Sequence, residues 1–192
     1  MLRYADRPVS LWRNGGGRTR ELASGPEGSA VADFGWRVSV AEVAAGGEFS
    51  AFPGVDRVIV LCDGPAMTLH VDRAERALAR HEPFAFSGDA ATTCAVPGGP
   101  TRDLNVMTRR GQWQADVSVL AAATGVPIDV SAAGVTLVVA LGPGVRVSSA
   151  ELGLAVDLTS YDAVRIDRGP EAIAPVALDS AAPVAVIHLS PT

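Results

Sequence analysis

The stretch Val58-Ile59-Val60-Leu61-Cys62-Asp63-Gly64-Pro65 is an apolar run of strand length that ends at a Gly-Pro turn. The same pattern returns 78 residues later as Thr136-Leu137-Val138-Val139-Ala140-Leu141-Gly142-Pro143. This spacing also places segment 84–89 over segment 162–167, and both segments end in Asp. Two copies of one double-stranded β-helix, or jelly roll, would produce such a repeat. The sequence therefore predicts an all-β chain with two barrels in succession.

The rest of the chain also favours short strands separated by turns. It has 20 glycines and 13 prolines among 192 residues, and alternation with period two recurs, for example in Trp36–Ala41. Helical periodicity is scarce, and only a short helix near Asp72–Arg76 is expected. We expect residues 1–192 to form one two-barrel unit, with a first half over about 1–121 and a second over 122–192.

Composition excludes several classes of partner. The net charge of −5 disfavours a nucleic-acid surface, which needs a basic face. The longest apolar stretch, 135–141, is too short to span a bilayer, and the N-terminal residues lack the apolar run of a signal peptide. Two cysteines do not make a disulfide framework. We expect a soluble cytoplasmic protein that binds neither nucleic acid nor membrane.

Several kinds of catalysis are also disfavoured by the residues available. The chain has no lysine, which removes Schiff-base chemistry and a phosphate-loop lysine. Its three histidines, His70, His81 and His188, lack the His-x-His spacing of metal-binding cupins, so no metal and no other cofactor is expected. Cys62 sits in a core-like strand, and no Gly-x-Ser-x-Gly elbow is present. We therefore assign no catalytic residue.

A glycine-rich segment, Asn14-Gly15-Gly16-Gly17-Arg18-Thr19, allows two interpretations. It is either a turn between two strands or a place where exposed backbone amides approach an anion closely. It is not a nucleotide-binding loop, because it lacks both the lysine and a strand-loop-helix context.

The remaining polar residues suit a small carboxylate. On a strand, alternate residues share one face, which groups 103, 105, 107 and 109, then Arg37 with Ser39, and Thr19 with Glu21. If these faces point into a barrel, arginine supplies a bidentate grip on a carboxylate, and acidic residues orient the arginine. The alternative is an internal salt-bridge network that only organises the barrel, formed by Arg37, Glu21, Asp103 and Arg109.

Five motifs occur in order along the chain and resemble the HutD/Ves family of bicupin proteins. They are Trp-x-Asn-Gly-Gly-Gly-x-Thr-Arg-Glu (12–21, with Arg13 before Asn14), Trp-Arg-x-Ser-x-Ala (36–41), Gly-x-Phe-Ser-x-Phe-Pro-Gly-x-Asp-Arg (47–57), Pro-Phe-x-Phe-x-Gly-Asp (83–89) and Asp-Leu-Asn-Val-Met-Thr-Arg-Arg-Gly (103–111). The resemblance covers about residues 8–120. It implies two β-barrels, no established catalytic activity, and a regulator of histidine utilisation that binds an intermediate such as urocanate or formylglutamate.

The polar positions within these motifs are the candidate ligand-binding residues. Arg37 and Arg109 are the expected anion grips, and Glu21 and Asp103 are expected to orient them, while Trp36, Phe49 and Phe52 are expected in the core or the cavity wall. The full set is Asn14, Thr19, Arg20, Glu21, Arg37, Ser39, Ser50, Arg57, Asp103, Asn105 and Arg109.

Two alternatives to a non-enzymatic, metal-free binding protein stay open. One is a metal-independent cupin isomerase or lyase acting on a small carboxylate, with Glu21 or Asp103 as general base. The other is a ligand-free stress-response or interaction protein whose motif residues are purely structural. Cupin barrels often pair through sheet edges, so a homodimer is the candidate assembly.

Overall fold

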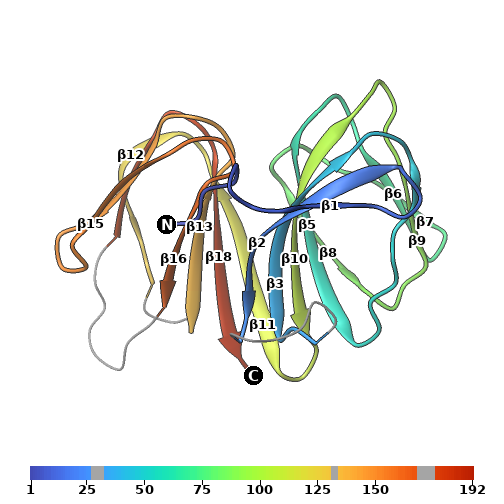
Figure 1. Cartoon of the computed structure of the whole chain (residues 1–192), viewed down its shortest axis with the longest axis horizontal. Coiled ribbons are helices and arrows are strands. Elements are labelled where there is room, and N and C mark those ends of the chain that lie inside the picture. The colour runs from blue at the N-terminus through green and yellow to red at the C-terminus, as the bar shows by residue number, and fades with distance from the viewer. Residues whose placement is uncertain (27–32, 131–133, 168–175) are drawn as a thin grey trace. The chain divides into compact units, whose positions relative to one another are not determined.

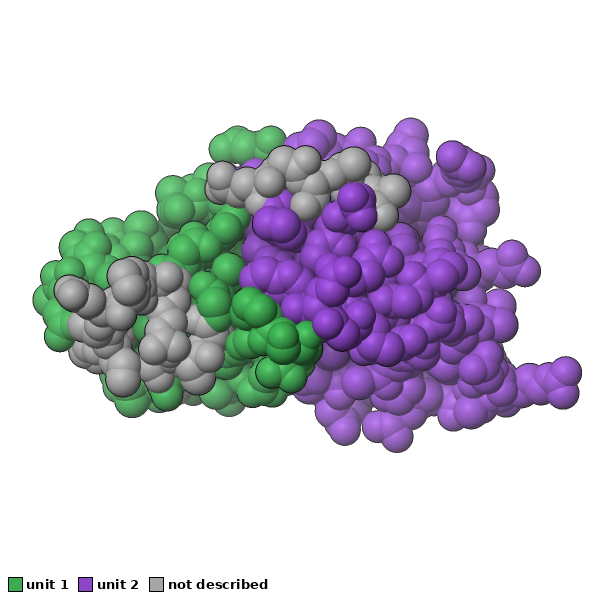
Figure 2. Space-filling model, turned by 90° about the horizontal axis from the view of Figure 1, so that it is seen from below, with its two compact units in different colours: residues 1–6, 114–192 green, residues 7–113 purple. Residues whose placement is uncertain are grey.

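The computed structural model describes residues 1–26, 33–130, 134–167 and 176–192, and every named element within them is a β-strand (Figure 1). The prediction of an all-β fold is confirmed. No helix in these ranges is long and apolar enough to cross a membrane. The chain divides into two compact units, which Figure 2 colours separately: unit 2 is Arg7–Trp113, and unit 1 combines Met1–Asp6 with Gln114–Thr192. The division falls between residues 113 and 114, and the boundary near 121 between the two halves stays a prediction.

Unit 2 contains a six-stranded and a four-stranded antiparallel sheet. In the larger sheet the order is β1-β2-β3-β10-β5-β8, and in the smaller sheet it is β4-β9-β6-β7. The strands are β1 (Val9–Leu11), β2 (Gly17–Gly25), β3 (Trp36–Val43), β4 (Gly47–Glu48), β5 (Val55–Asp63), β6 (Thr68–Val71), β7 (Ala74–Ala77), β8 (Pro83–Ser87), β9 (Thr92–Ala95) and β10 (Thr101–Arg109).

Apolar side chains from both sheets of unit 2 meet in one core. Ile59 and Leu61 of β5 pack with Leu69 of β6 and Cys94 of β9, and all four are buried. The core fills one part of the barrel interior, since further along the same strands the inward positions become polar, as at Arg57 and Asn105.

Unit 1 contains two four-stranded sheets. Their orders are β11-β18-β13-β16 and β12-β17-β14-β15. The apolar core between them includes Val138, Val147, Leu178 and Val186. The strands are β11 (Trp113–Leu120), β12 (Ala123–Ile128), β13 (Val135–Ala140), β14 (Val145–Ser149), β15 (Leu154–Leu158), β16 (Ala163–Asp167), β17 (Val176–Ser180) and β18 (Val184–Pro191).

The two units repeat one eight-stranded pattern. The orders β3-β10-β5-β8 and β4-β9-β6-β7 become those of unit 1 when eight is added to each strand number. The repeat predicted from β5 and β13 is therefore present. The hairpin β1–β2 precedes the repeat and extends the larger sheet of unit 2.

Two details of the sequence prediction are wrong. A spacing of 78 residues would make Val60 equivalent to Val138. The side chains that enter the core between the two sheets are those of Ile59 and Leu61 in unit 2, and those of Val138 and Ala140 in unit 1. Because side chains alternate between faces, the equivalent spacing at this strand is odd. The expected helix near 72–76 is instead the β6–β7 hairpin, whose turn residues Asp72 and Arg73 have positive φ angles of 46° and 73°.

Candidate functional site

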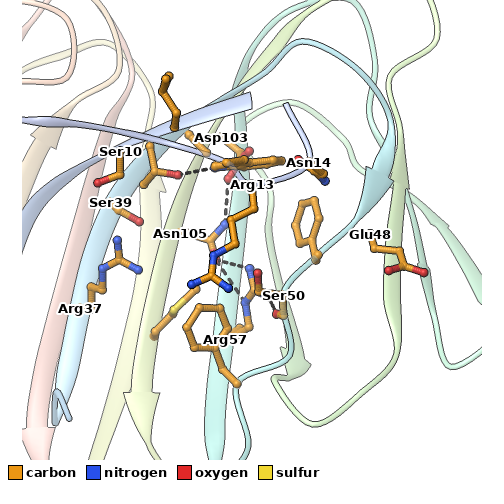
Figure 3. Close-up of a pocket in the computed structure, with 17 residues that line it drawn as sticks. Ser10, Arg13, Asn14, Arg37, Ser39, Glu48, Ser50, Arg57, Asp103 and Asn105 are labelled. Carbon is orange, nitrogen blue, oxygen red and sulfur yellow. Dashed lines mark hydrogen bonds between the residues drawn. The ribbon is translucent and has the colours of Figure 1, made fainter. Parts of the chain in front are cut away.

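A cavity of about 450 Å³ opens in unit 2 and is lined by residues of the larger sheet, the β1–β2 turn and the segment after β4 (Figure 3). Its lining mixes guanidinium, amide, hydroxyl and carboxylate groups with aromatic rings. The lining residues are Ser10, Leu11, Trp12, Arg13, Asn14, Thr19, Arg37, Ser39, Ala41, Glu48, Phe49, Ser50, Phe52, Arg57, Asp103, Asn105 and Met107.

The strand register explains why polar groups far apart in sequence meet here. In β10, Asn105 pairs with Ser39 of β3 on one side and with Ile59 of β5 on the other. Two residues along, Met107 pairs with Arg37 and Arg57. Alternate residues of a strand share one face, so a single row across three strands carries both arginines. The prediction that the 103-105-107 face of β10 meets the Arg37–Ser39 face of β3 agrees with this arrangement.

Arg57 is the most buried cation of the cavity, with 5% of its surface exposed. Its Nε and Nη2 atoms donate to Asn105 Oδ1 at 3.3 and 2.9 Å, and Nη1 lies 3.5 Å from the Ser50 carbonyl oxygen. The guanidinium carbon lies 4.8 to 5.5 Å from the ring centroids of Phe86, Phe49 and Phe52, which favours the cation.

Burial lowers the pKa of Arg57 from its ordinary value to about 10, against the opposing effect of Asp103. The residue therefore stays charged at neutral pH. Among the described residues, no carboxylate forms an ion pair with its guanidinium. Arg57 is thus a buried positive charge whose direct partners are neutral oxygens and aromatic faces.

Asp103 lies behind Asn105 and is completely buried. Its Oδ1 atom accepts a hydrogen bond of 2.8 Å from Asn105 Nδ2, whereas Oδ2 has no hydrogen-bond partner among the described residues. Burial raises the pKa of Asp103 from 3.8 to about 6, although the Asn105 hydrogen bond and the Arg57 charge pull it down. A carboxylate with one bare oxygen in a low-dielectric site is poorly stabilised when ionised.

Arg37 is the second cation of the cavity and has a carboxylate partner. Its Nε donates to Glu21 Oε2 at 2.7 Å, and Ser24 donates to the other Glu21 oxygen at the same distance. Glu21 therefore holds the Arg37 side chain in place, and the part of this pair in binding an anion stays a prediction. Arg13 and Glu48 complete the charged lining and are exposed, and in Figure 3 the Glu48 carboxylate points away from Arg57.

The glycine-rich segment forms the turn of the β1–β2 hairpin. Gly15 has a φ of +70°, and the Asn14 side chain closes the turn by accepting from the Gly16 amide at 3.0 Å. Beside the turn, Trp12 Nε1 donates to Thr19 Oγ1 at 2.8 Å, which fixes the indole at the cavity wall. The turn interpretation of this segment is therefore correct, and it also brings Asn14 to the cavity.

Eight of the eleven candidate residues line the cavity: Asn14, Thr19, Arg37, Ser39, Ser50, Arg57, Asp103 and Asn105. The other three do not. Arg20 donates to the Arg7 carbonyl oxygen, Glu21 acts through Arg37, and Arg109 donates to the Pro53 carbonyl oxygen and stacks over Phe34. Arg109 keeps the correct alternation but comes at the end of β10 and does not line the cavity, so the cavity gives no support for its predicted role as an anion grip.

Sequence reasoning missed part of the lining and misjudged which arginine is central. Phe49 and Phe52 form walls and Trp36 is a core residue, and both agree with the expectation. Arg13 and Trp12 belong to the first motif but are not among the candidate residues, whereas Met107 lies on the strand face that the sequence predicted for positions 103, 105, 107 and 109. Ala41 ends the second motif and shares the strand face of Arg37 and Ser39, whereas Glu48, Ser10 and Leu11 gave no sequence signal. Among the described residues, no group of three or more His, Cys, Asp or Glu side chains is placed to hold a metal ion.

Two eight-stranded barrels in succession, one with a polar cavity in its interior, give the chain a two-barrel cupin fold. A family model places the chain more narrowly. The HutD model matches residues 3–184, and the chain therefore belongs to the HutD family.

Similar proteins agree with this assignment. Protein Ves of Citrobacter koseri is 47% identical over 114 residues, which are 58% of this chain and 59% of that protein. The chain thus spans about three fifths of the length of the curated relatives it matches. Among solved structures, HutD from Pseudomonas fluorescens SBW25 in a formate condition is 30% identical with a TM-score of 0.85, and the match covers 100% of this chain and 97% of that one. A conserved protein of unknown function from Pseudomonas aeruginosa PAO1 is 32% identical with a TM-score of 0.88, covering 98% and 97%.

Proposed function

We propose that the cavity of unit 2 binds a small carboxylate metabolite and that the protein is a non-enzymatic regulator of histidine utilisation. One observation carries the proposal: Arg57 is a buried guanidinium that lines a cavity and has no carboxylate partner among the described residues. An anion entering the cavity would supply the missing charge where the low dielectric strengthens the attraction.

The lining also indicates what kind of carboxylate fits. Arg57 lies deep, Arg37 is held in place by Glu21, and Arg13 is exposed at the cavity. Neutral donors and acceptors such as Ser39 and Asn14 lie between these charges, and Phe49 and Phe52 form apolar walls. We infer that the ligand is an intermediate of histidine breakdown, urocanate or formylglutamate, since the chain belongs to the HutD family. By sequestering it in the cytoplasm, the protein would limit induction of the pathway.

Isothermal titration calorimetry tests this function directly. The protein is titrated with urocanate, N-formylglutamate, histidine, glutamate and formate, and saturable binding of at least one carboxylate is expected. Arg57→Met should weaken that binding tenfold or more, because losing a charged hydrogen-bond partner costs about 1.5–3 kcal/mol. Arg76→Met is the matched control, since Arg76 is an exposed arginine of the same unit outside the cavity. No heat with any of the five compounds would favour a ligand-free interaction protein instead.

A second candidate function is a metal-independent isomerase or lyase. The observation that favours it is the buried carboxyl of Asp103, whose raised pKa of about 6 suits a general base near neutral pH. Glu21 does not line the cavity and is held by Arg37 and Ser24, so Asp103 is the stronger candidate. NMR of each compound after long incubation separates the two functions: unchanged ligand supports binding, whereas a new product that Asp103→Asn no longer forms supports catalysis.

A further inference from the structure

Arg57, Asn105 and Asp103 form a continuous hydrogen-bonded chain, here called the buried triad. Arg57 donates to the Asn105 carbonyl oxygen, and the Asn105 amide donates to Asp103. The exposed fractions are 5% for Arg57, 5% for Asn105 and 0% for Asp103. The triad therefore places one positive and one negative charge in a buried site, separated by a neutral amide.

We propose that anion binding at Arg57 is coupled to the uptake of one proton by Asp103. The inference rests on the proposed function, because it concerns the same cavity and requires that a carboxylate occupy it. With an anion beside Arg57 and Asp103 ionised, the buried site would hold two negative charges and one positive charge. Burying an uncompensated charge is expensive, and protonation of Asp103 removes it.

The geometry identifies Asp103 as the group that gives up its charge. Its Oδ2 atom has no donor among the described residues, so only one hydrogen bond stabilises the ionised form. The Arg57 charge provides the remaining stabilisation, and a bound anion would compete for that charge. The Asp103 pKa, already about 6 because of burial, must then rise further on binding.

The other charged and titratable groups around the site are already accounted for. Arg57 stays protonated, and an anion beside it raises its pKa back toward the ordinary value. Arg37 on β3 is paired with Glu21 on β2. The thiols of Cys62 on β5 and Cys94 on β9, both of which interact electrostatically with Asp103, have pKa values raised by burial and stay neutral. Arg13 and Glu48 are exposed to solvent.

The coupling makes affinity depend on pH with a definite sign. A group whose pKa rises on binding favours the complex at lower pH, and one full proton corresponds to about tenfold in Kd per pH unit. Binding should therefore tighten as the pH falls from 8 toward 6. Below about pH 6 the free protein already holds the proton, so the affinity should level off.

Calorimetry in two cationic buffers of different ionisation enthalpy, Tris and Bis-Tris, measures the proton uptake directly. The probes are N-formylglutamate and formate, which have no group of their own titrating between pH 6 and 8. Wild type is expected to take up close to one proton near pH 7. Asp103→Asn should bind with no proton uptake and with the same affinity at pH 6 and 8. Glu48→Gln, which removes an exposed carboxylate from the same cavity, should retain the uptake.

The outcomes separate this inference from the function on which it rests. Binding with equal affinity at pH 6 and 8 and equal heats in both buffers would overturn the coupling and leave the binding function intact. If N-formylglutamate, formate and urocanate all fail to bind, both the coupling and the binding function are refuted. If Asp103→Asn does not fold, carbon-13 NMR of aspartate-labelled wild type replaces it. One carboxyl signal titrating near pH 6 should move to higher pH when N-formylglutamate is added, and an unmoved signal would contradict the proposal.

Discussion

Replacing Asp103 with asparagine is predicted to stabilise the folded protein at neutral pH, although the residue is completely buried and hydrogen-bonded. The rise of its pKa from 3.8 to about 6 corresponds to about 3 kcal/mol by which the fold disfavours the ionised carboxyl. Asparagine is neutral and nearly isosteric, and its oxygen can accept from Asn105 as Oδ1 does. Its amide N–H groups would lack an acceptor where Oδ2 now stands, which costs about 1–3 kcal/mol and reduces the gain to about 0–2 kcal/mol.

The pH dependence gives this prediction a second, independent test. Between about pH 4 and 6 the folded protein binds more protons at Asp103 than the unfolded chain does, so the wild-type contribution to stability falls as the pH rises through that window. The advantage of Asp103→Asn should therefore be full above pH 6 and disappear toward pH 4. Urea denaturation at pH 4, 5, 6 and 8, with equal m-values for both proteins, measures it. A variant that is less stable than wild type at pH 8, or whose advantage does not change with pH, would refute this account of the buried triad.

Three further substitutions have definite expected outcomes. Asp162→Asn should destabilise the protein by about 1–3 kcal/mol at pH 7, because the carboxylate accepts from Arg3, from the Tyr4 amide and from Thr159. These hydrogen bonds lower the Asp162 pKa, so the loss of stability should become smaller at acid pH in urea denaturation measured over a pH series. Gly64→Ala should lower the thermal stability more than Gly99→Ala does. Both glycines have positive φ, but only a Cβ at Gly64 would meet the Pro100 oxygen and Thr101 at 2.7 Å. Equal losses of stability would contradict this steric explanation. Leu178→Ala should cost about 2–5 kcal/mol in urea without changing carboxylate affinity by calorimetry, because Leu178 is a core residue of unit 1 and does not line the cavity.

The fold was predictable because its strongest signals are local. Apolar runs such as Val58–Leu61 and 136–139 end at Gly-Pro turns, and both became strands in equivalent positions of the two units. Their exact equivalence was not predictable, because both faces of these strands are buried and alternation no longer distinguishes one face from the other. The Asp72-Arg73 turn was missed because the second residue of such a loop is usually glycine, and arginine is not a typical choice for positive φ there.

The candidate site was predictable where strand alternation sets direction and unpredictable where it does not. Arg37, Ser39, Asp103 and Asn105 lie on paired strands, and their common face follows from the period of two. Arg109 has the same parity, but sequence does not indicate how far along β10 the cavity extends. The central position of Arg57 depends on the pairing of β5 with β10, a contact between residues about 50 positions apart that no local pattern specifies.

The composition of unit 1 has a consequence for the order in which the chain acquires its structure. Unit 2 is one continuous segment, whereas unit 1 needs residues 1–6 together with residues after 113. The Leu2–Ala163 bridge and the Arg3–Asp162 ion pair thus close over about 160 residues, a separation that makes early closure entropically unfavourable. Once unit 2 has folded, its 107 residues are no longer flexible, so the flexible part of that loop is shorter and its closure costs less entropy. During synthesis the strands that carry Arg57, Asn105 and Asp103 are complete before β16 exists, so unit 2 is available to fold first and the N-terminal residues are secured last.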